Sequence, residues 1–450
     1  MSKLKPYPKY KDSAVEWLGE IPEGWKTRKI KYLAEIKTGT TPSTSNERYY
    51  DDNEGYLWIK PEDLSEFAPV QKTEKYLTKR GLKVGRAISQ PSVQVNCIGD
   101  VGEFGITEEE VFSTNQQINS LILKRGSSLN YRYFQYAIST SKDEHKKASL
   151  TVVVPILNTS REGQIQLPKP SLNEQERIIE YLEVKRALIE SLIEEQNKEI
   201  KLLKEYRQKI INQAVTCGID ENGKLRERPG WEKGEPIPEG WKDSGVEWLG
   251  LIPEGWEISK IKHLIRLRKE ENKNDVEKFL YLGLENVESW TGKIVKKEEM
   301  SRYESKMNNF RKGDVLFGKL RPYLAKVYLA EEQGSCVLEF LVTEPIELLG
   351  EFLKYKFLSK DFIEIVNNST YGAKMPRANW DFIGNLKIAY PNKTKQQRIT
   401  GYLNGKIGVI EKQIVKQEKL INYFKEYKNS LITYIVTGKM DVSLVNENHD

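Results

Sequence analysis

Two stretches of this chain are copies of one another, and this internal repeat constrains the fold more than any other feature. Residues 11–33 (KDSAVEWLGEIPEGWKTRKIKYL) recur at 242–264 (KDSGVEWLGLIPEGWEISKIKHL), with 17 of 23 positions identical. Farther along, residues 174–220 match residues 395–441, with 19 of 47 positions identical. Long matches at a nearly fixed spacing identify a duplicated unit. We therefore predict two copies of one unit, each with an aromatic lead, a middle region and a long polar-apolar segment.

The middle regions, 37–168 and 268–390, have diverged. They align poorly, although Pro155 and Asn158 still match Pro376 and Asn379 near their ends. The repeated leads and long segments flank these divergent middle regions. This arrangement indicates that the flanking segments contact the same partner twice, whereas the middle regions contact two different targets.

Both middle regions alternate short β-rich runs with turn clusters. Runs of this kind start at Gly55, Ser92, Asp314 and Asn385, and a short helical pattern covers 131–137. We expect two α/β or α+β domains with a substantial β content.

The repeated long segments are predicted to be helices. Ser171, followed by Glu174, has the pattern of a capping box that starts the first helix. Apolar residues recur at alternating steps of four and three, which is typical of a coiled-coil seam. Such a stripe can also mark an ordinary core, but equal length and repeated position favour two helices that pack on each other, antiparallel if a pseudo-two-fold axis relates the copies. The seam positions include Ile178, Leu182, Ile189 and Leu203 in the first copy and Ile399, Leu403, Ile410 and Phe424 in the second.

Composition and catalytic signatures narrow the functional classes. Lys and Arg number 71 against 65 Asp and Glu, an excess compatible with a polyanionic partner. Cys97, Cys217 and Cys336 are too far apart for a CxxC pair, and no apolar run suits an export signal or a membrane span, so we expect a cytoplasmic protein. The sequence contains no P-loop, no GxGxxG, no methyltransferase motif and no histidine pair at metal-ligand spacing. We predict no catalytic residue and no metal ligand.

Turns in both middle regions interleave polar, aromatic and basic residues. The first contains the turn 38–43 (TGTTPS) and an amide run whose side chains can pair with adenine. The second contains GKLRPY at 318–323 and the run 369–379, which offer groups for phosphate and guanine contacts. The candidate DNA contacts are Lys60, Asn115, Gln116 and Gln117 in the first region and Lys319, Arg321, Tyr371, Lys374 and Arg377 in the second.

Several motifs together resemble the specificity subunit of type I restriction-modification systems. They are the two EWLG-IPEGW leads, YLWIKPEDL, NCIGDVGEFGI, GDVLFGKLRPYLAKV, and the helix starts PSLNEQERIIEYL and PNKTKQQRITGYL. The resemblance extends from about residue 7 to residue 441. It divides the chain into a target recognition domain (1–170), a spacer helix (171–217), a linker (218–246), a second target recognition domain (247–392), a distal helix (393–437) and a tail (438–450).

The resemblance implies a non-catalytic reader of double-stranded DNA. Each recognition domain would read one half of an asymmetric bipartite site, while the helices would set the spacing and dock two methyltransferase subunits. The candidate docking residues are the seam residues Ile178, Leu182, Ile189, Leu203, Ile399, Leu403, Ile410 and Phe424. Restriction and translocase subunits would join the full complex. S-adenosylmethionine, ATP and Mg²⁺ are expected on those partner subunits and not on this chain.

Two readings from other functional classes stay open at this point. The chain could be a scaffold whose globular domains hold proteins, with the polar turns serving structure alone. It could also be an enzyme with methyltransferase or nuclease activity of its own.

Overall fold

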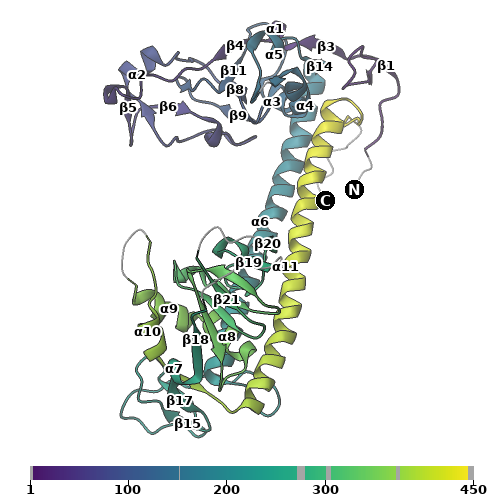
Figure 1. Cartoon of the computed structure of the whole chain (residues 1–450). Helices are drawn as coiled ribbons and strands as arrows, with labels where there is room; N and C mark the ends of the chain where they lie inside the picture. The colour runs from purple at the N-terminus through teal and green to yellow at the C-terminus, as the bar shows by residue number, and fades with distance from the viewer. Residues whose placement is uncertain (1–3, 152, 271–278, 301–305, 371–374, 444–450) are drawn as a thin grey trace. The chain divides into compact units, whose positions relative to one another are not determined.

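The structure is a computed structural model that describes residues 4–151, 153–270, 279–300, 306–370 and 375–443. It divides into two compact units, unit 1 (Met1–Glu194 and Leu420–Asp450) and unit 2 (Glu195–Lys419). Each unit holds one sheet-rich domain, the first domain or the second domain, and a part of each long helix, α6 (Leu172–Cys217) and α11 (Lys393–Val436) (Figure 1). The prediction of a mixed α/β fold with two sheet-rich domains and two long helices is confirmed.

The first domain is built on a sheet in the order β4-β11-β8-β9 and a smaller sheet in the order β10-β6-β7-β5. The β-rich runs predicted at Gly55 and Ser92 are β6 and β8, and the predicted helix is α3. Its strands are β1 (Tyr10–Asp12), β2 (Glu20–Pro22), β3 (Lys26–Lys29), β4 (Ala34–Thr38), β5 (Tyr50–Asp51), β6 (Tyr56–Ile59), β7 (Tyr76–Leu77), β8 (Ser92–Asn96), β9 (Phe104–Thr107), β10 (Ser113–Thr114), β11 (Ile118–Leu123), β12 (Leu150–Thr151), β13 (Pro155–Ile156) and β14 (Gln166–Lys169). Its helices are α1 (Ile30–Leu33), η1 (Glu47–Tyr49), η2 (Pro61–Asp63), α2 (Lys79–Val84), α3 (Tyr131–Thr140), α4 (Lys142–Ala148) and α5 (Thr159–Glu162).

The second domain repeats this plan with sheets in the orders β18-β25-β22-β23 and β20-β19-β24-β21. The runs predicted at Asp314 and Asn385 lead into β22 and β26. Its strands are β15 (Trp241–Asp243), β16 (Leu251–Pro253), β17 (Glu257–Lys260), β18 (Ile265–Arg268), β19 (Phe279–Leu282), β20 (Glu298–Met300), β21 (Met307–Phe310), β22 (Val315–Gly318), β23 (Val327–Leu329), β24 (Gly334–Val337), β25 (Phe340–Pro345) and β26 (Lys387–Tyr390). Its helices are α7 (Ile261–Leu264), η3 (Leu284–Asn286), η4 (Pro322–Leu324), α8 (Gly350–Leu358), α9 (Lys360–Asn368) and α10 (Trp380–Asn385).

The main sheets of the two divergent middle regions therefore have one strand order, whereas the second sheets differ in an edge strand, which is β5 beside β7 in the first domain and β21 beside β24 in the second. The hairpin β1-β2 corresponds to β15-β16, and the pair β3-β14 corresponds to β17-β26, with the same antiparallel register. Asn158 caps α5 and Asn379 caps α10, each through its side-chain oxygen. The sequence anchors that survive near the ends of the middle regions are thus helix caps, which supply an otherwise missing acceptor to the first turn.

A buried glutamine joins the start of each long helix to its domain. Gln175 of α6 accepts a hydrogen bond from the Asn130 backbone at 2.7 Å and donates to the Pro170 carbonyl at 3.0 Å. Gln396 of α11 makes the same pair of bonds, from Leu349 at 2.8 Å and to Pro391 at 2.8 Å. Each glutamine satisfies backbone groups at the point where a helix leaves a loop, which fixes the direction of the helix relative to its own domain.

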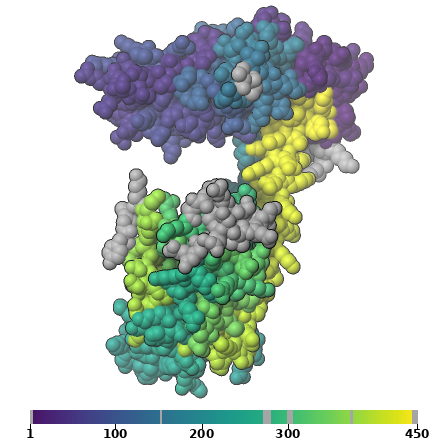
Figure 2. Space-filling model, viewed as in Figure 1, coloured from purple at the N-terminus to yellow at the C-terminus, as the bar shows by residue number. Residues whose placement is uncertain are grey.

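The helix segments within each unit run antiparallel. In unit 1, Ile178 and Leu182 near the start of α6 share a core with Leu431 and Ile435 near the end of α11. In unit 2, Arg207 near the end of α6 binds Glu411 in the earlier half of α11. Figure 2 shows that α11, in yellow, keeps one side exposed in this view. None of the helices in the described ranges combines the length and apolarity needed to cross a membrane.

Candidate nucleic-acid interface

The first domain has a junction where three loops meet beyond the end of β8. The Cys97 amide donates to the Gln117 carbonyl at 2.7 Å, and the Gly99 amide donates to the Pro155 carbonyl at 3.0 Å. The Leu157 amide donates back to the Cys97 carbonyl at 2.8 Å. These bonds define the first junction, which is made of segments 97–99, 115–117 and 155–157.

The second domain has an equivalent junction beyond the end of β22. The Lys319 amide donates to the Glu339 carbonyl at 2.9 Å, and the Arg321 amide donates to the Pro376 carbonyl at 2.8 Å. The Ala378 amide donates to the Lys319 carbonyl at 2.8 Å. Two motifs that are separated in the sequence, GKLRPY and the run that ends at Asn379, are therefore brought together in this second junction.

The second junction carries exposed cationic side chains. The Arg377 side chain is 59% exposed, and its guanidinium donates to Glu339 at 2.7 Å. Arg321 is exposed and Lys319 is half-buried. Guanidinium groups exposed at a loop junction suit bidentate contacts to phosphate or guanine. Tyr371 and Lys374, the other two candidates in this region, lie outside the described residues.

Arg321 has an unusual backbone conformation. Its φ is +50°, in the left-handed region, and the equivalent residue of the first junction is Gly99 with φ +83°. Glycine adopts this conformation without a steric penalty, whereas a side chain makes it unfavourable. An arginine at this position therefore costs stability, and such strain is concentrated at functional sites.

The first junction presents amides in place of cations. Asn115 is buried, and its side chain donates to Gln117 Oε1 at 3.0 Å while accepting from the Gln117 backbone. Gln116 is exposed, and its Oε1 accepts a hydrogen bond from the Thr41 hydroxyl. Among the three candidate amides, Asn115 braces the loop, and Gln116 and the half-buried Gln117 face outward.

The turn 38–43 rests directly on the amide segment. The Thr40 amide donates to the Thr114 carbonyl at 2.9 Å. A Cβ atom at Gly39 would collide with the carbonyl oxygens of Thr114 and Asn115, so only glycine allows this approach. The TGTTPS and NQQ motifs therefore form one surface of the first domain.

Lys60 is already paired within the first domain. Its ammonium binds Glu74 at 2.8 Å and Glu62 at 3.5 Å and lies 5.5 Å from the centre of the Trp58 ring. The hydrogen bond to Glu74 contributes most to raising the lysine pKa. A phosphate contact by Lys60 would have to compete with these carboxylates.

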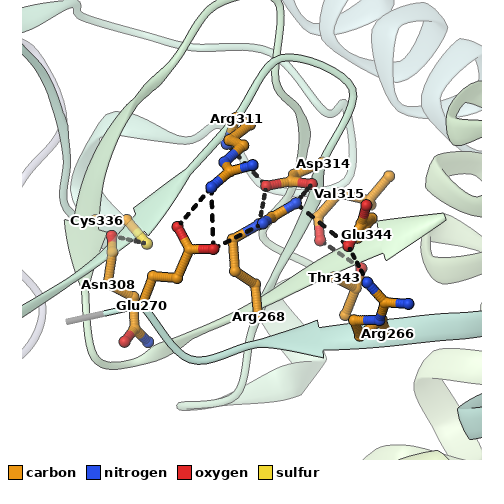
Figure 3. A network of polar contacts seen from close by, with 10 residues as sticks. All are labelled: Arg266, Arg268, Glu270, Asn308, Arg311, Asp314, Val315, Cys336, Thr343 and Glu344. Carbon is orange, nitrogen blue, oxygen red and sulfur yellow. Dashed lines mark hydrogen bonds and ion pairs between the residues drawn. The ribbon is translucent and has the colours of Figure 1, made fainter.

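An ion-pair network links strands of the main sheet of the second domain at the start of β22, the opposite end of this strand from the second junction (Figure 3). Arg268 on β18 binds Asp314 through two bonds, Nε to Oδ2 at 2.9 Å and Nη2 to Oδ1 at 3.2 Å. It also binds Glu270 at 3.0 Å and Glu344 at 3.4 Å, so it links β18 to β25 and to the start of β22. The hydrogen bond to Asp314 is the largest cause of the raised Arg268 pKa. Sequence reasoning missed this network, although Arg266, Arg268 and Glu270 place a charged residue at every second position, which gives a signal for it.

The predicted seam residues are used in the packing of the chain itself. Ile178, Leu182, Ile189, Ile399, Leu403 and Ile410 are buried, and Leu203 and Phe424 are half-buried. Other apolar residues of the same helices are exposed at positions that the repeat makes equivalent. They are Leu188, Tyr423 and Tyr427 in unit 1 and Val409, Leu202 and Tyr206 in unit 2. We call these six residues the repeated apolar set.

The cysteines are free and buried, at Cys97, Cys217 and Cys336. Burial raises the pKa of the Cys97 thiol to about 12 and also raises that of Cys336. Both thiols are therefore protonated at neutral pH. Within the described residues, no group of three or more His, Cys, Asp or Glu side chains is arranged to hold a metal ion.

Comparisons with known proteins agree on one relationship. Residues 22–202 match the family model described as type I restriction modification DNA specificity domain. The type I restriction enzyme MjaIX specificity subunit of Methanocaldococcus jannaschii is 23% identical over 94% of this chain and 95% of its own length. The HindI specificity subunit of Haemophilus influenzae is 30% identical over 36% of this chain and 35% of its own length.

A solved structure shows the same fold. It concerns complex assembly and conformational transition of the type I R-M system, and one of its chains matches with a TM-score of 0.62 and 12% identity. The match covers 92% of this chain and 98% of that chain.

Proposed function

We propose that the chain is a type I restriction-modification specificity subunit, the DNA-reading, non-catalytic member of such a complex. Each sheet-rich domain reads one half of an asymmetric bipartite site in double-stranded DNA. The long helices set the distance between the halves and dock two methyltransferase subunits.

One observation carries this proposal: two domains whose main sheets have the same strand order present different chemistry at the same place. The first junction offers amide groups and Gly99, whereas the second offers Lys319, Arg321 and Arg377. Amides pair bidentately with adenine, and guanidinium groups pair with guanine or phosphate. A duplicated frame with two dissimilar edges suits a site whose halves differ in sequence.

Replacing Arg321 by glycine tests the role of the second junction. Glycine is the residue of the first junction at this position and suits the left-handed backbone, so Arg321→Gly removes the guanidinium and the strain together. If Arg321 contacts a base, we expect a loss of about 1–3 kcal/mol in binding and relaxed selectivity at one position of one half-site. If it contacts a phosphate, affinity falls about equally for all sequences and the salt slope becomes shallower.

The measurement is DNA binding by the chain assembled with its methyltransferase subunits, over a series of salt concentrations. Arg311→Gln is a control, since Arg311 binds Glu270 in the ion-pair network away from the junction. Unchanged affinity and selectivity in both Arg321→Gly and Arg377→Gln would contradict the assignment of the second junction.

The repeated apolar set supports docking of two identical partners. In unit 1 the exposed residues are Leu188 of α6 and Tyr423 and Tyr427 of α11. In unit 2 the equivalent residues are Val409 of α11 and Leu202 and Tyr206 of α6. Exposed apolar side chains at duplicated positions suit two copies of one subunit.

We expect Leu188→Lys and Val409→Lys each to weaken binding of one methyltransferase copy, as measured by native mass spectrometry. Val184→Lys is the control, because the exposed Val184 corresponds to Gly405 in the other helix. Full occupancy in the double variant would contradict docking through this set.

The proposal assigns chemistry to the partner subunits. S-adenosylmethionine, ATP and Mg²⁺ bind to the methyltransferase and restriction subunits, and this chain selects the DNA sequence. The purified chain incubated with DNA and S-adenosylmethionine, or with DNA and Mg²⁺, is expected to leave the DNA unmethylated and uncut. A scaffold that holds only proteins would give no salt-dependent DNA binding in the assembled complex, so the binding measurement separates the two functions.

A further inference from the structure

A row of buried polar side chains crosses the first domain from α5 to the end of β4. Glu162 Oε2 accepts a hydrogen bond from Asn119 Nδ2 at 2.6 Å. Asn119 Oδ1 in turn accepts from the Thr38 hydroxyl at 2.7 Å. Glu162 also faces His145, and both side chains are fully buried. We call His145, Glu162, Asn119 and Thr38 the buried polar row.

The buried side chains of His145 and Glu162 face each other inside the first domain. His145 Nδ1 lies 2.8 Å from the Ser141 carbonyl oxygen, which can only accept, so Nδ1 carries a hydrogen. Nε2 lies 3.5 Å from Glu162 Oε1, and neither atom has a hydrogen-bond partner among the described residues. A proton held between these two atoms would remove the repulsion of two facing lone pairs. Burying such a pair costs free energy that its mutual attraction only partly offsets.

The second domain has apolar residues at the positions that correspond to His145 and Glu162. Ser141 and Ser359 precede equivalent helices, α4 and α9. The His145 amide donates to the Ser141 carbonyl, and the Ile363 amide donates to the Ser359 carbonyl in the same way. His145 therefore corresponds to Ile363, which is buried.

The other two inner positions follow the same rule. The Glu162 amide bonds to the capping Asn158, and the Ile383 amide bonds to the capping Asn379, so Glu162 corresponds to Ile383. The register of β25 on β18 places Leu341 where Asn119 stands in β11. The shared topology is therefore compatible with an apolar core here, and the polar row serves something particular to the first domain.

The polar row ends where the outer surface begins. Thr38 is the last residue of β4, and the turn 38–43 follows it onto the amide segment. The Gly39 amide donates to the Ile118 carbonyl at 3.0 Å, and the Thr40 amide donates to Thr114 at 2.9 Å. The Thr38–Asn119 bond thus adds a side-chain tie at the point where β4 ends and the turn begins.

We infer that the buried polar row positions the turn 38–43, and through it sets the sequence selectivity of the first domain. His145, Glu162, Asn119 and Thr38 are positioning residues in this assignment and do not contact DNA. The inference rests on the proposed function, because it concerns the half-site that the first domain reads.

The test replaces the row by the residues of the second domain. The variant Asn119→Leu, His145→Ile and Glu162→Ile is assembled with its methyltransferase subunits, and methylated motifs are compared by single-molecule sequencing. The half-site of the first domain is identified as the one whose consensus Arg321→Gly leaves unchanged. We expect discrimination at that half-site to fall about tenfold and the other half-site to keep its consensus.

Two further variants make the result specific. In Glu162→Gln, the new amide can accept a hydrogen bond from Asn119 and donate one to a neutral His145, so this variant should keep the selectivity of the wild type. Thr38→Val keeps the buried part intact and cuts only the last bond, so it should relax the same half-site even if the triple variant does not fold.

The outcomes distinguish the inference from its premise. If the wild-type complex yields no bipartite motif, the proposed function fails. If the wild type yields one and both the folded triple variant and Thr38→Val keep the consensus of both half-sites, the polar row is only core filling and the inference is overturned. Equal loss at both half-sites would also overturn it, because that is the effect of general destabilisation.

Discussion

Lys356 shows how one residue can hold a long helix to its domain. It lies on α8, is buried, and donates from Nζ to the carbonyl oxygen of Val215 in the last turn of α6 at 2.9 Å. The equivalent carbonyl of Val436 at the end of α11 accepts from the hydroxyl of Tyr133 at 3.3 Å. Burial lowers the Lys356 pKa to about 8, while the Asp361 charge opposes this shift.

The lowered pKa of Lys356 predicts a specific pH dependence of stability. Between pH 8 and the ordinary lysine value of 10.5, the unfolded chain binds more protons than the folded one, so this residue makes stability rise with pH. Below pH 8 the charge is kept and its full desolvation cost remains. In urea unfolding across this range, Lys356→Met should lose that rise relative to the wild type, whereas Lys360→Met at an exposed position should keep it. Equal slopes in the wild type and Lys356→Met would contradict the assignment.

Residue type alone could not show which of the candidate side chains have partners within the chain. Residue type suggested that Asn115 and Lys60 could contact DNA, yet Asn115 is buried against Gln117 and Lys60 binds two carboxylates. Partners such as Glu74 lie outside the motif and become neighbours only through the fold. The position of Arg321 opposite Pro376 could not be predicted either, because it depends on the bridge between Leu320 and Arg377, which are 57 residues apart in the sequence.

The long helices were the most predictable elements. Their seam periodicity and the capping box at Ser171 appear in the structure as helices 172–217 and 393–436, and the Ser171 hydroxyl binds Glu174 at 2.8 Å. The sequence could not indicate that parts of the seam would join the domain cores, because that depends on how strands and helices of each unit close around them. The short strands are less regular, so their pairing order came only from the structure.

One ion-paired carboxylate links the two helices within unit 2. Glu411 of α11 binds Arg207 of α6 and, at 2.6 Å, Lys293 of the second domain. Burial raises the Glu411 pKa, but the hydrogen bonds from Lys293 and Arg207 outweigh burial and lower it below 4.5 overall. The stabilisation is therefore present above the ordinary pKa and is lost as the pH falls through the folded value.

Replacing this carboxylate should remove part of the acid sensitivity. At pH 7 we expect Glu411→Gln to lower the free energy of unfolding by about 2 kcal/mol, because charge-assisted hydrogen bonds are lost. Toward pH 3 the difference from the wild type should shrink. Glu418→Gln, at an exposed position of the same helix, is the control. A difference that stays constant from pH 7 to pH 3 in urea unfolding would contradict the linkage.

At the scale of the whole molecule, duplication is the organising feature. The two domains share the strand order of the main sheet, the helix caps and the glutamine joints, while their junctions differ in charge. The repeat in the sequence predicted the two-unit plan, and the divergence of the middle regions predicted different targets. It could not predict that the main sheets of the divergent regions keep one strand order, because backbone topology is maintained by burial patterns that tolerate many residue changes.

Helix length should control the spacing between the half-sites. Inserting seven helical residues into both helices, after Glu194 in α6 and after Lys419 in α11, keeps the seam in phase and adds about 10 Å. We expect the unspecified spacer of the recognised site to grow by roughly two to three base pairs, with both half-site sequences unchanged. Methylome sequencing of the doubly lengthened variant gives the spacer directly. An unchanged spacer would contradict the role of the helices.

The most direct test of the central claim is single-molecule methylome sequencing of a host that expresses this chain with its methyltransferase subunit, beside the same host without the chain. The account predicts a new adenine-methylated motif in two dissimilar halves with a fixed spacer, present only when the chain is expressed. With both proteins expressed and their complex confirmed, the absence of a new motif would contradict the claim that this chain selects the DNA site.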